Sequence, residues 1–177
     1  MRQYWRGPWP PLHKAAGTAL ASSTTLTDIS PTPPNVIAAN TLEEGVAVIL
    51  EASGFFSTTG TPTLLLGFYL GGVAGSALAA SPAITTGSGA ASWAWRMRYK
   101  GRLRAIGTSG SIVGYGTLEL GTSLTALTVS PIPTVAANRT VTWDTTAAKS
   151  VTVGAQWGTS SASNTITCDE ILVELAS

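Results

Sequence analysis

The sequence predicts an all-β protein, a β-sandwich of jelly-roll or Greek-key type with an extended N-terminal arm. Three observations support this fold class. Segments rich in β-branched and aromatic residues recur throughout the chain, and the turns between them are rich in Ser, Thr, Gly and Ala. No segment shows a convincing helical periodicity, and residues 92–106 alternate strictly between two kinds of side chain, as a long strand with one buried face does.

Residues 1–34 are expected to form an anchoring arm and linker, and residues 35–177 the sandwich domain. Pro8, Pro10 and Pro11 exclude a helix near the N-terminus and favour an extended chain. Residues 15–34 are small and polar and end in further prolines, which predicts a linker or an early edge strand.

Seven strands are expected in the sandwich domain, at residues 46–56, 64–70, 92–106, 111–120, 139–143, 150–157 and 164–175. In the third of them the odd positions from Trp93 to Ala105 should face the core, and the cations at even positions should face away. In the last strand, simple alternation predicts that Ile166, Cys168 and Glu170 share one face, while Thr167, Asp169 and Ile171 share the other.

The longest apolar stretch, LLLGFYLGGVAGSALAA at residues 64–80, is long enough to suggest a membrane span. Gly71 and Gly72 interrupt it in the middle, and its second half is only weakly apolar. We therefore interpret it as a buried strand that leads into a glycine-rich turn, and expect no membrane partner.

The composition excludes several classes of protein. The chain has 177 residues and a mass of 18.1 kDa, only 11% of its residues are charged, and its net charge is +1. Disorder driven by high charge is excluded, and a nucleic-acid binder is disfavoured. One cysteine and one histidine leave no material for a disulfide scaffold or for a Cys-based or His-cluster metal site. We expect no cofactor and no enzymatic activity.

Individual titratable residues give little reason to expect catalysis. His13 lies beside Lys14 with no acid nearby in sequence, and Cys168 is interpreted as a buried free thiol. The acidic neighbours in Glu43-Glu44 and Asp169-Glu170 should point to opposite faces unless a bulge intervenes, so neither forms an obvious pair for glycoside hydrolysis. A hydrolase is kept as a third, less favoured reading.

Two features suggest contacts with partners. One is a solvated, aggregation-resistant face or a contact surface for an acidic partner or a neighbouring subunit, formed by the outward-facing cations Arg96, Arg98, Lys100, Arg102 and Arg104. These cations could also follow a phosphate backbone, but the chain lacks the overall basicity of a nucleic-acid binder. The arm carries Tyr4, Trp5, Arg6 and Trp9, residue types that dominate interface hot spots, and we expect it to anchor the protein on a partner. The alternative is that the arm packs back on its own sandwich.

Three stretches carry a family resemblance: AANTLEEGVAVILEASGFFSTTGTPTLLLGFYLGG, ASWAWRMRYKGRLRAIGTSGSIVGYGTLEL and VTWDTTAAKSVTVGAQWGTSSASNTITCDEILVEL. Together they resemble small structural proteins of tailed bacteriophages, especially those that infect actinobacteria. Proteins of this kind are described as capsid decoration, head fibre, minor capsid or minor tail proteins. The resemblance implies a jelly-roll domain, commonly trimeric, that attaches to the virion through its N-terminal segment, and it implies no catalytic signature.

The expected function is therefore that of a non-enzymatic virion structural protein, most simply a decoration or minor capsid protein on the outside of a phage head. Its expected partners are further copies of itself in a homotrimer and the major capsid protein or another virion protein. The charge-free span at residues 52–95 supports oligomerisation, because part of this apolar surface should lie between subunits. The alternative is a receptor- or carbohydrate-binding module of a tail fibre or baseplate, which would need exposed rings among Trp93, Trp95, Trp143 and Trp157.

Overall fold

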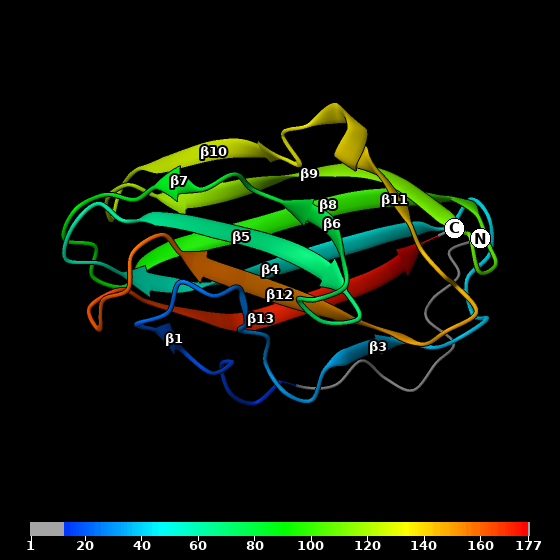
Figure 1. The fold of residues 1–177 in the computed structure, drawn as a ribbon, viewed down its shortest axis with the longest axis horizontal. Helices are drawn as coiled ribbons and strands as arrows, with labels where there is room; N and C mark the ends of the chain where they lie inside the picture. The colour runs from blue at the N-terminus through cyan, green and yellow to red at the C-terminus, as the bar shows by residue number, and fades with distance from the viewer. Residues whose placement is uncertain (1–12, 177) are drawn as a thin grey trace.

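The fold consists of two antiparallel β-sheets packed face to face, as the ribbon in Figure 1 shows. The structure is a computed structural model that describes residues 13–176. The prediction of an all-β sandwich is confirmed. Residues 1–12, which include the expected anchor residues Tyr4, Trp5, Arg6 and Trp9, lie outside the described residues.

Sheet A has seven strands in the order β1-β13-β4-β8-β9-β10, with β11 paired to β9 beyond the end of β10. Their bounds are β1 Leu20–Ala21, β4 Ala47–Ser57, β8 Trp93–Ala105, β9 Ser111–Gly121, β10 Leu127–Ile132, β11 Thr140–Thr142 and β13 Thr165–Ala176. A short 3-10 helix, η1 (Ala136–Arg139), leads into β11 and projects from the edge of the sheet (Figure 1).

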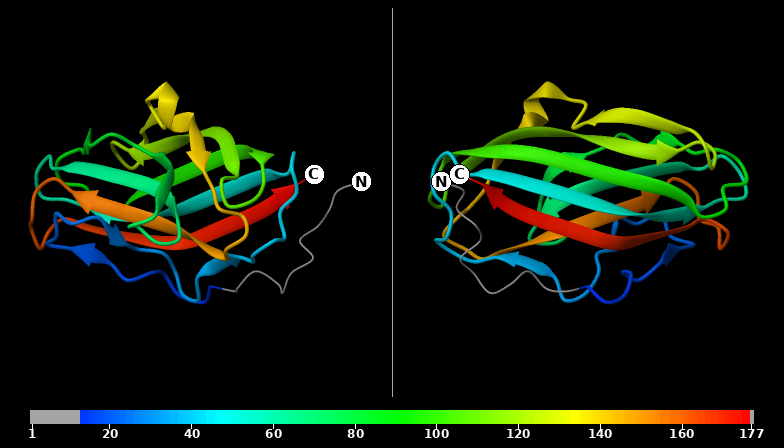
Figure 2. Two further views of the ribbon diagram at one scale, coloured as in Figure 1. Left: turned by 45° about the vertical axis from the view of Figure 1, so that its right-hand side comes forward. Right: turned by 180° about the vertical axis from the view of Figure 1, so that it is seen from behind.

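Sheet B has six strands, with β2-β12-β5-β6 as its main path, β3 also paired to β12, and β7 also paired to β5. Their bounds are β2 Thr27–Asp28, β3 Asn35–Ile37, β5 Thr63–Leu70, β6 Ser76–Ala80, β7 Ile84–Thr85 and β12 Lys149–Trp157. The chain crosses repeatedly between the two layers, which are seen from two further sides in Figure 2. In sheet A the last strand, β13, lies between β1 and β4, and β8, β9 and β10 follow β4 in chain order.

The core lies between the two sheets and is rich in large aromatic side chains. Trp95 on β8 and Trp157 on β12 face it from opposite sheets, and both are essentially inaccessible to solvent. Trp143, in the loop after β11, closes the same cluster. Because aromatic rings bury large apolar areas, they account for much of the burial that a sandwich of this size needs.

All seven expected strands are present within a residue or two of their predicted ends. Strands β1 and β2 lie within residues 15–34, where an early edge strand was one of the two expectations, and four further strands, β3, β6, β7 and β10, were not expected. The longest, β10, contains Pro131 and exposes Leu127 and Val129, so its sequence lacks the pattern of a half-buried strand. Its place at the edge of sheet A explains the proline, because an edge strand can lack one backbone donor.

Residues 13–34 lie against the sandwich. The Gly17 N–H donates to the Cys168 carbonyl oxygen over 2.8 Å, β1 pairs with β13, and β2 pairs with β12. Leu20 and Ile29 are buried in the core cluster. The described half of the expected arm and linker therefore supplies edge strands to both sheets.

The last strand departs from simple alternation, and the prediction for Ile171 and Glu170 is wrong. Cys168 pairs with Gly54 while Glu170 pairs with Ser53, so Asp169 is an extra residue in a β-bulge. The bulge shifts the facing by one position, and as a result Ile171 is buried in the core and Glu170 is exposed. The Thr167 carbonyl beside the bulge accepts a hydrogen bond from the Trp95 indole N–H over 3.0 Å.

The apolar stretch at residues 64–80 forms β5, a turn and β6. Gly71 and Gly72, with φ of 77° and 90°, make the turn in a region of backbone space that favours glycine. In the part of the chain at residues 13–176, no helix has the length and apolar character to cross a membrane.

Candidate interaction face on sheet A

Strand β8 presents two different faces, and the expected register is confirmed. Its odd positions Trp95, Met97, Tyr99 and Leu103 are buried in the core. Its even positions carry the cations Arg96, Arg98, Lys100, Arg102 and Arg104, all on the outer face of sheet A. The alternation of the sequence therefore places five positive side chains in one column along the middle of the sheet.

Glu51 on β4 neutralises one end of this column. Its carboxylate accepts a hydrogen bond from the Arg96 guanidinium over 2.6 Å and lies 3.9 Å from Arg98. The hydrogen bond to Glu51 is the main reason why the pKa of Arg96 is raised, with smaller contributions from Glu119 and Glu170. Glu119 on β9 is opposite Arg96 in register but is not within ion-pair distance of it. The first two cations of the column are thus already partnered.

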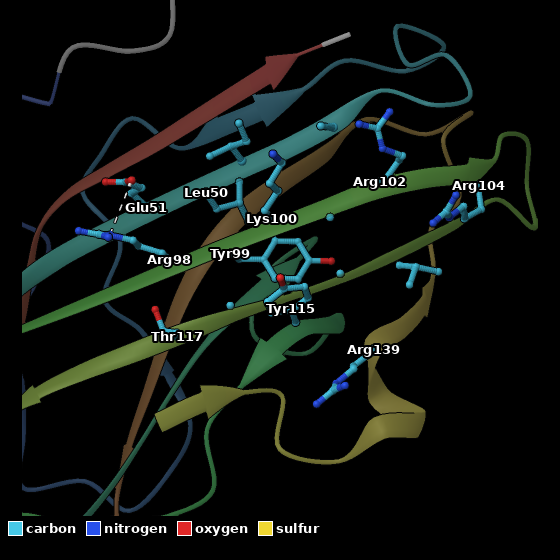
Figure 3. Close-up of a pocket in the computed structure, with 16 residues that line it drawn as sticks. Leu50, Glu51, Arg98, Tyr99, Lys100, Arg102, Arg104, Tyr115, Thr117 and Arg139 are labelled. Atoms are coloured by element: carbon cyan, nitrogen blue, oxygen red, sulfur yellow. Dashed lines mark ion pairs between the residues drawn. The ribbon is translucent and has the colours of Figure 1, made fainter. Parts of the chain in front are cut away.

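The other end of the column is different. Within residues 13–176, Lys100, Arg102 and Arg104 have no carboxylate within ion-pair distance. One Nη of Arg102 donates to the Gly45 carbonyl oxygen over 2.6 Å, which holds its side chain along the sheet. These three cations line a shallow groove of about 650 Å³ on the outer face of sheet A, shown in Figure 3.

The groove gains two residues that the sequence did not single out. Arg139, at the end of η1, lines the side of the groove beyond β9, and Tyr115 on β9 lies between Arg139 and the β8 cations (Figure 3). Tyr115 is 69% exposed, although it pairs directly with Lys100 in the sheet. Alternation in β9 could have assigned Tyr115 to the outer face, whereas only the fold brings Arg139 to the groove.

Apolar side chains are exposed on the same face. Besides Tyr115, the register places Phe55, Leu127, Val129 and Leu172 on the outer side of sheet A, each 48–60% exposed. A second hollow, of about 330 Å³, lies at the end of the face away from the basic groove, and Phe55, Leu127, Glu119 and Asp169 are among the residues that line it. The face therefore combines a basic groove at one end with an apolar and acidic hollow at the other.

The four sandwich tryptophans do not form an exposed platform. Trp95, Trp143 and Trp157 are buried, and Trp93 is half-buried with its ring edge-on to Phe56 at 6.2 Å. Sugar-binding sites use aromatic rings whose faces are open to solvent. The arrangement of these tryptophans thus favours a role in the core over one in sugar stacking.

Cys168 and His13, the cysteine and histidine that could act as nucleophile and base, both have environments that do not favour catalysis. Burial raises the pKa of the Cys168 thiol to about 12, so it stays neutral, and the thiol donates a hydrogen bond to the Glu170 carbonyl. His13 places its Nε2 atom 3.0 Å from the Pro33 carbonyl oxygen. Asp169 and Glu170 do lie at a bulge, but the Glu170 carboxylate accepts a hydrogen bond from the Ser53 hydroxyl. Across residues 13–176, no group of three His, Cys, Asp or Glu side chains could hold a metal ion.

No protein-family model, curated protein or solved structure matches this chain.

Proposed function

We propose that this chain is a non-enzymatic structural protein of a phage virion, a decoration or minor capsid protein that attaches to the outside of the head. The observation that carries the proposal is the outer face of sheet A. Its exposed apolar residues, and cations that have no carboxylate partner within residues 13–176, lie on one side of a sandwich whose two sheets enclose a buried core. Contiguous exposed apolar surface with polar surroundings is characteristic of protein contact sites.

The proposal of a phage virion rests on the resemblance to small phage structural proteins. The proposal that the protein is not an enzyme is supported by the environments of two side chains, Cys168 and His13. Cys168 is buried and neutral, which makes it an inert thiol. His13 directs its Nε2 atom at a backbone carbonyl and has no acid partner within ion-pair distance among the described residues. Neither residue is prepared to act as a nucleophile or a general base.

The proposal includes self-association as a homotrimer. Phe55, Leu127, Val129 and Leu172 would be partly covered by neighbouring subunits, which accounts for their exposure in the single chain. Further copies would also present several N-terminal arms at once, and such multivalency strengthens attachment without new contacts.

The test measures occupancy on particles that lack this protein. Removing residues 1–12 should leave a folded sandwich, because residues 13–176 by themselves supply two paired sheets and the buried cluster between them. The truncated protein should bind particles far more weakly than the full chain. Undiminished occupancy would show that the sandwich alone makes the attachment, and absence of the full chain from purified particles would contradict the proposal.

A second pair of variants tests the face itself. Leu127→Ser with Val129→Ser removes apolar side chains from the outer face of sheet A, whereas Val36→Ser with Ile106→Ser removes exposed apolar side chains elsewhere. We expect only the first pair to lower particle occupancy or to shift the oligomer towards monomer in sedimentation. Equal effects of the two pairs would mean that the face has no special role.

A further inference from the structure

We propose that the basic groove of sheet A binds an extended acidic segment of a partner protein, through Lys100, Arg102, Arg104 and Arg139. The inference rests on the proposed function in one respect, the existence of a partner protein, and it adds the chemistry by which that partner is recognised. The groove is distinct from the N-terminal arm, which it does not require.

The spacing of the β8 cations matches the side-chain repeat of an extended peptide. Lys100, Arg102 and Arg104 occupy alternate positions of one strand, so successive charges lie about 6.6–6.8 Å apart. An extended peptide with carboxylates at alternate residues has the same repeat, because its side chains also alternate between two faces. The pairing with β9 is irregular between Leu103 and Ala105, yet Arg104 still lines the groove.

The groove contains positive charges that no carboxylate of the described residues neutralises. Arg98, which lines one end of the groove, shares Glu51 with Arg96, whereas Lys100, Arg102 and Arg104 have no carboxylate partner in the described part of the chain. Glu174 on β13 is separated from Lys100 by Ile49, and Glu43 and Glu44, which precede Gly45, are not within ion-pair distance of the three cations. Arg139 adds a fourth charge on the opposite side of Tyr115. A segment laid along the groove would thus meet cations on both sides.

The groove offers apolar contacts as well as charge. Ala47 and Ile49 on β4 and Val113 on β9 line it on the two sides of the β8 cations, and Tyr115 is 69% exposed. Side chains of an acidic segment that do not bear charge could pack on these surfaces. Tyr and Arg are also among the residue types enriched in the hot spots of protein interfaces.

A nucleic acid fits the face less well than a short acidic segment. Single-stranded nucleic acids are bound by long positive grooves that follow the backbone. Here the row of free positive charges ends at Lys100, because the next two cations towards the start of β8, Arg98 and Arg96, are paired with Glu51. Glu119 and Glu170 lie further along the same face and add negative charge there. The net charge of the whole chain is only +1.

The experiment uses the full-length protein and three fluorescent probes in about 50 mM salt, where surface charges are weakly screened. The first probe is a peptide of about 12 residues in which Glu and Thr alternate, to match the strand repeat. The second has the same composition with all Glu residues in one block, and the third is an oligothymidylate of the same net charge. Fluorescence anisotropy measures each Kd.

We expect the alternating peptide to bind most tightly. Lys100→Gln with Arg104→Gln should weaken its binding roughly tenfold, because each substitution removes one charge pair. The matched control is Lys14→Gln with Lys149→Gln, which lowers the net charge equally but leaves the groove intact. This control should change the Kd less than about twofold, since both sites lie outside the groove.

Three results would overturn the inference. One is equal weakening by the groove and control variants, which would indicate general attraction by net charge. Another is equal binding of the alternating and block peptides, which would remove the role of spacing. The third is tighter binding of the oligothymidylate, which would assign the groove to nucleic acid. None of these measurements involves a particle, so the groove inference and the virion role can fail separately.

Discussion

The two faces of strand β8 place opposite demands on their residues. On the inner face, Trp95, Met97 and Tyr99 have almost no contact with solvent and are fixed by their neighbours. On the outer face, Lys100 and Arg104 are exposed and have no carboxylate partner among the described residues. A single alternating segment therefore supplies the centre of the core and the centre of the candidate binding face. Substitutions on the inner side should alter stability, and those on the outer side should alter binding.

The largest effect is expected for Trp95→Ala. The substitution removes a buried indole and leaves the Thr167 carbonyl at the bulge without its hydrogen bond. The free energy of unfolding should fall by about 3–5 kcal/mol, measured by urea denaturation. Tyr115→Ala on the outer face is the matched aromatic control and should change it by less than about 0.5 kcal/mol. A similar loss of unfolding free energy in both variants would show that the two faces of β8 do not differ in their contribution to stability.

A smaller effect on the inner face is expected for Gly101→Ala. The Tyr99 ring lies over this position, and a Cβ atom there would be 2.5 Å from the Tyr99 hydroxyl oxygen and 2.7 Å from Ile112 Cδ1. Such overpacking should lower the free energy of unfolding by about 1–3 kcal/mol. The Tyr99 hydroxyl is buried with no hydrogen-bond partner in residues 13–176, so Tyr99→Phe alone should be neutral or slightly stabilising.

Combining the two substitutions sharpens the test. Because Tyr99→Phe removes the atom nearest to the new methyl group, the double variant should be more stable than Gly101→Ala alone. Strict additivity of the two changes in urea denaturation would show that the tyrosine does not occupy the space above Gly101.

The smallest effect on stability is expected for Glu51→Gln on the outer face. The carboxylate and both of its arginine partners are partly open to solvent, and such pairs contribute little to folding. The substitution should instead release Arg96 and Arg98 and extend the free positive column from three cations to five. Binding of the alternating acidic peptide should become about threefold tighter at low salt, an effect that fades as salt rises. An unchanged or weaker affinity in the anisotropy assay would contradict the assignment of the outer face to acidic partners.

The fold could be predicted from the sequence to the extent that local patterns decide it. The alternation from Trp93 to Ala105 predicted both the strand and its register, because one face is buried and the other is not. Strand β10 was missed because neither of its faces is well buried, and Ile171 was misplaced because a bulge has no reliable local signature.

The candidate site could be predicted only in part. The five cations of β8 follow from alternation within one segment, but the pairing of Arg96 with Glu51 joins residues 45 positions apart. Arg139 reaches the groove through the loop between β10 and β11, and its own neighbours in sequence give no hint of that position. Which charges are free to bind is a property of the tertiary arrangement, because partners come from other strands.

The bulge in β13 also determines where this chain could change its length. Asp169 is the one residue of the strand that has no counterpart on β4, so a deletion at 169 would restore regular alternation and keep Ile171 and Val173 in the core. A deletion beyond Glu170, with the bulge retained, would turn the rest of the strand over, with Leu172 or Glu174 directed inward. Among related sequences that keep this sandwich, gains and losses of single residues in this strand should therefore concentrate at the bulge.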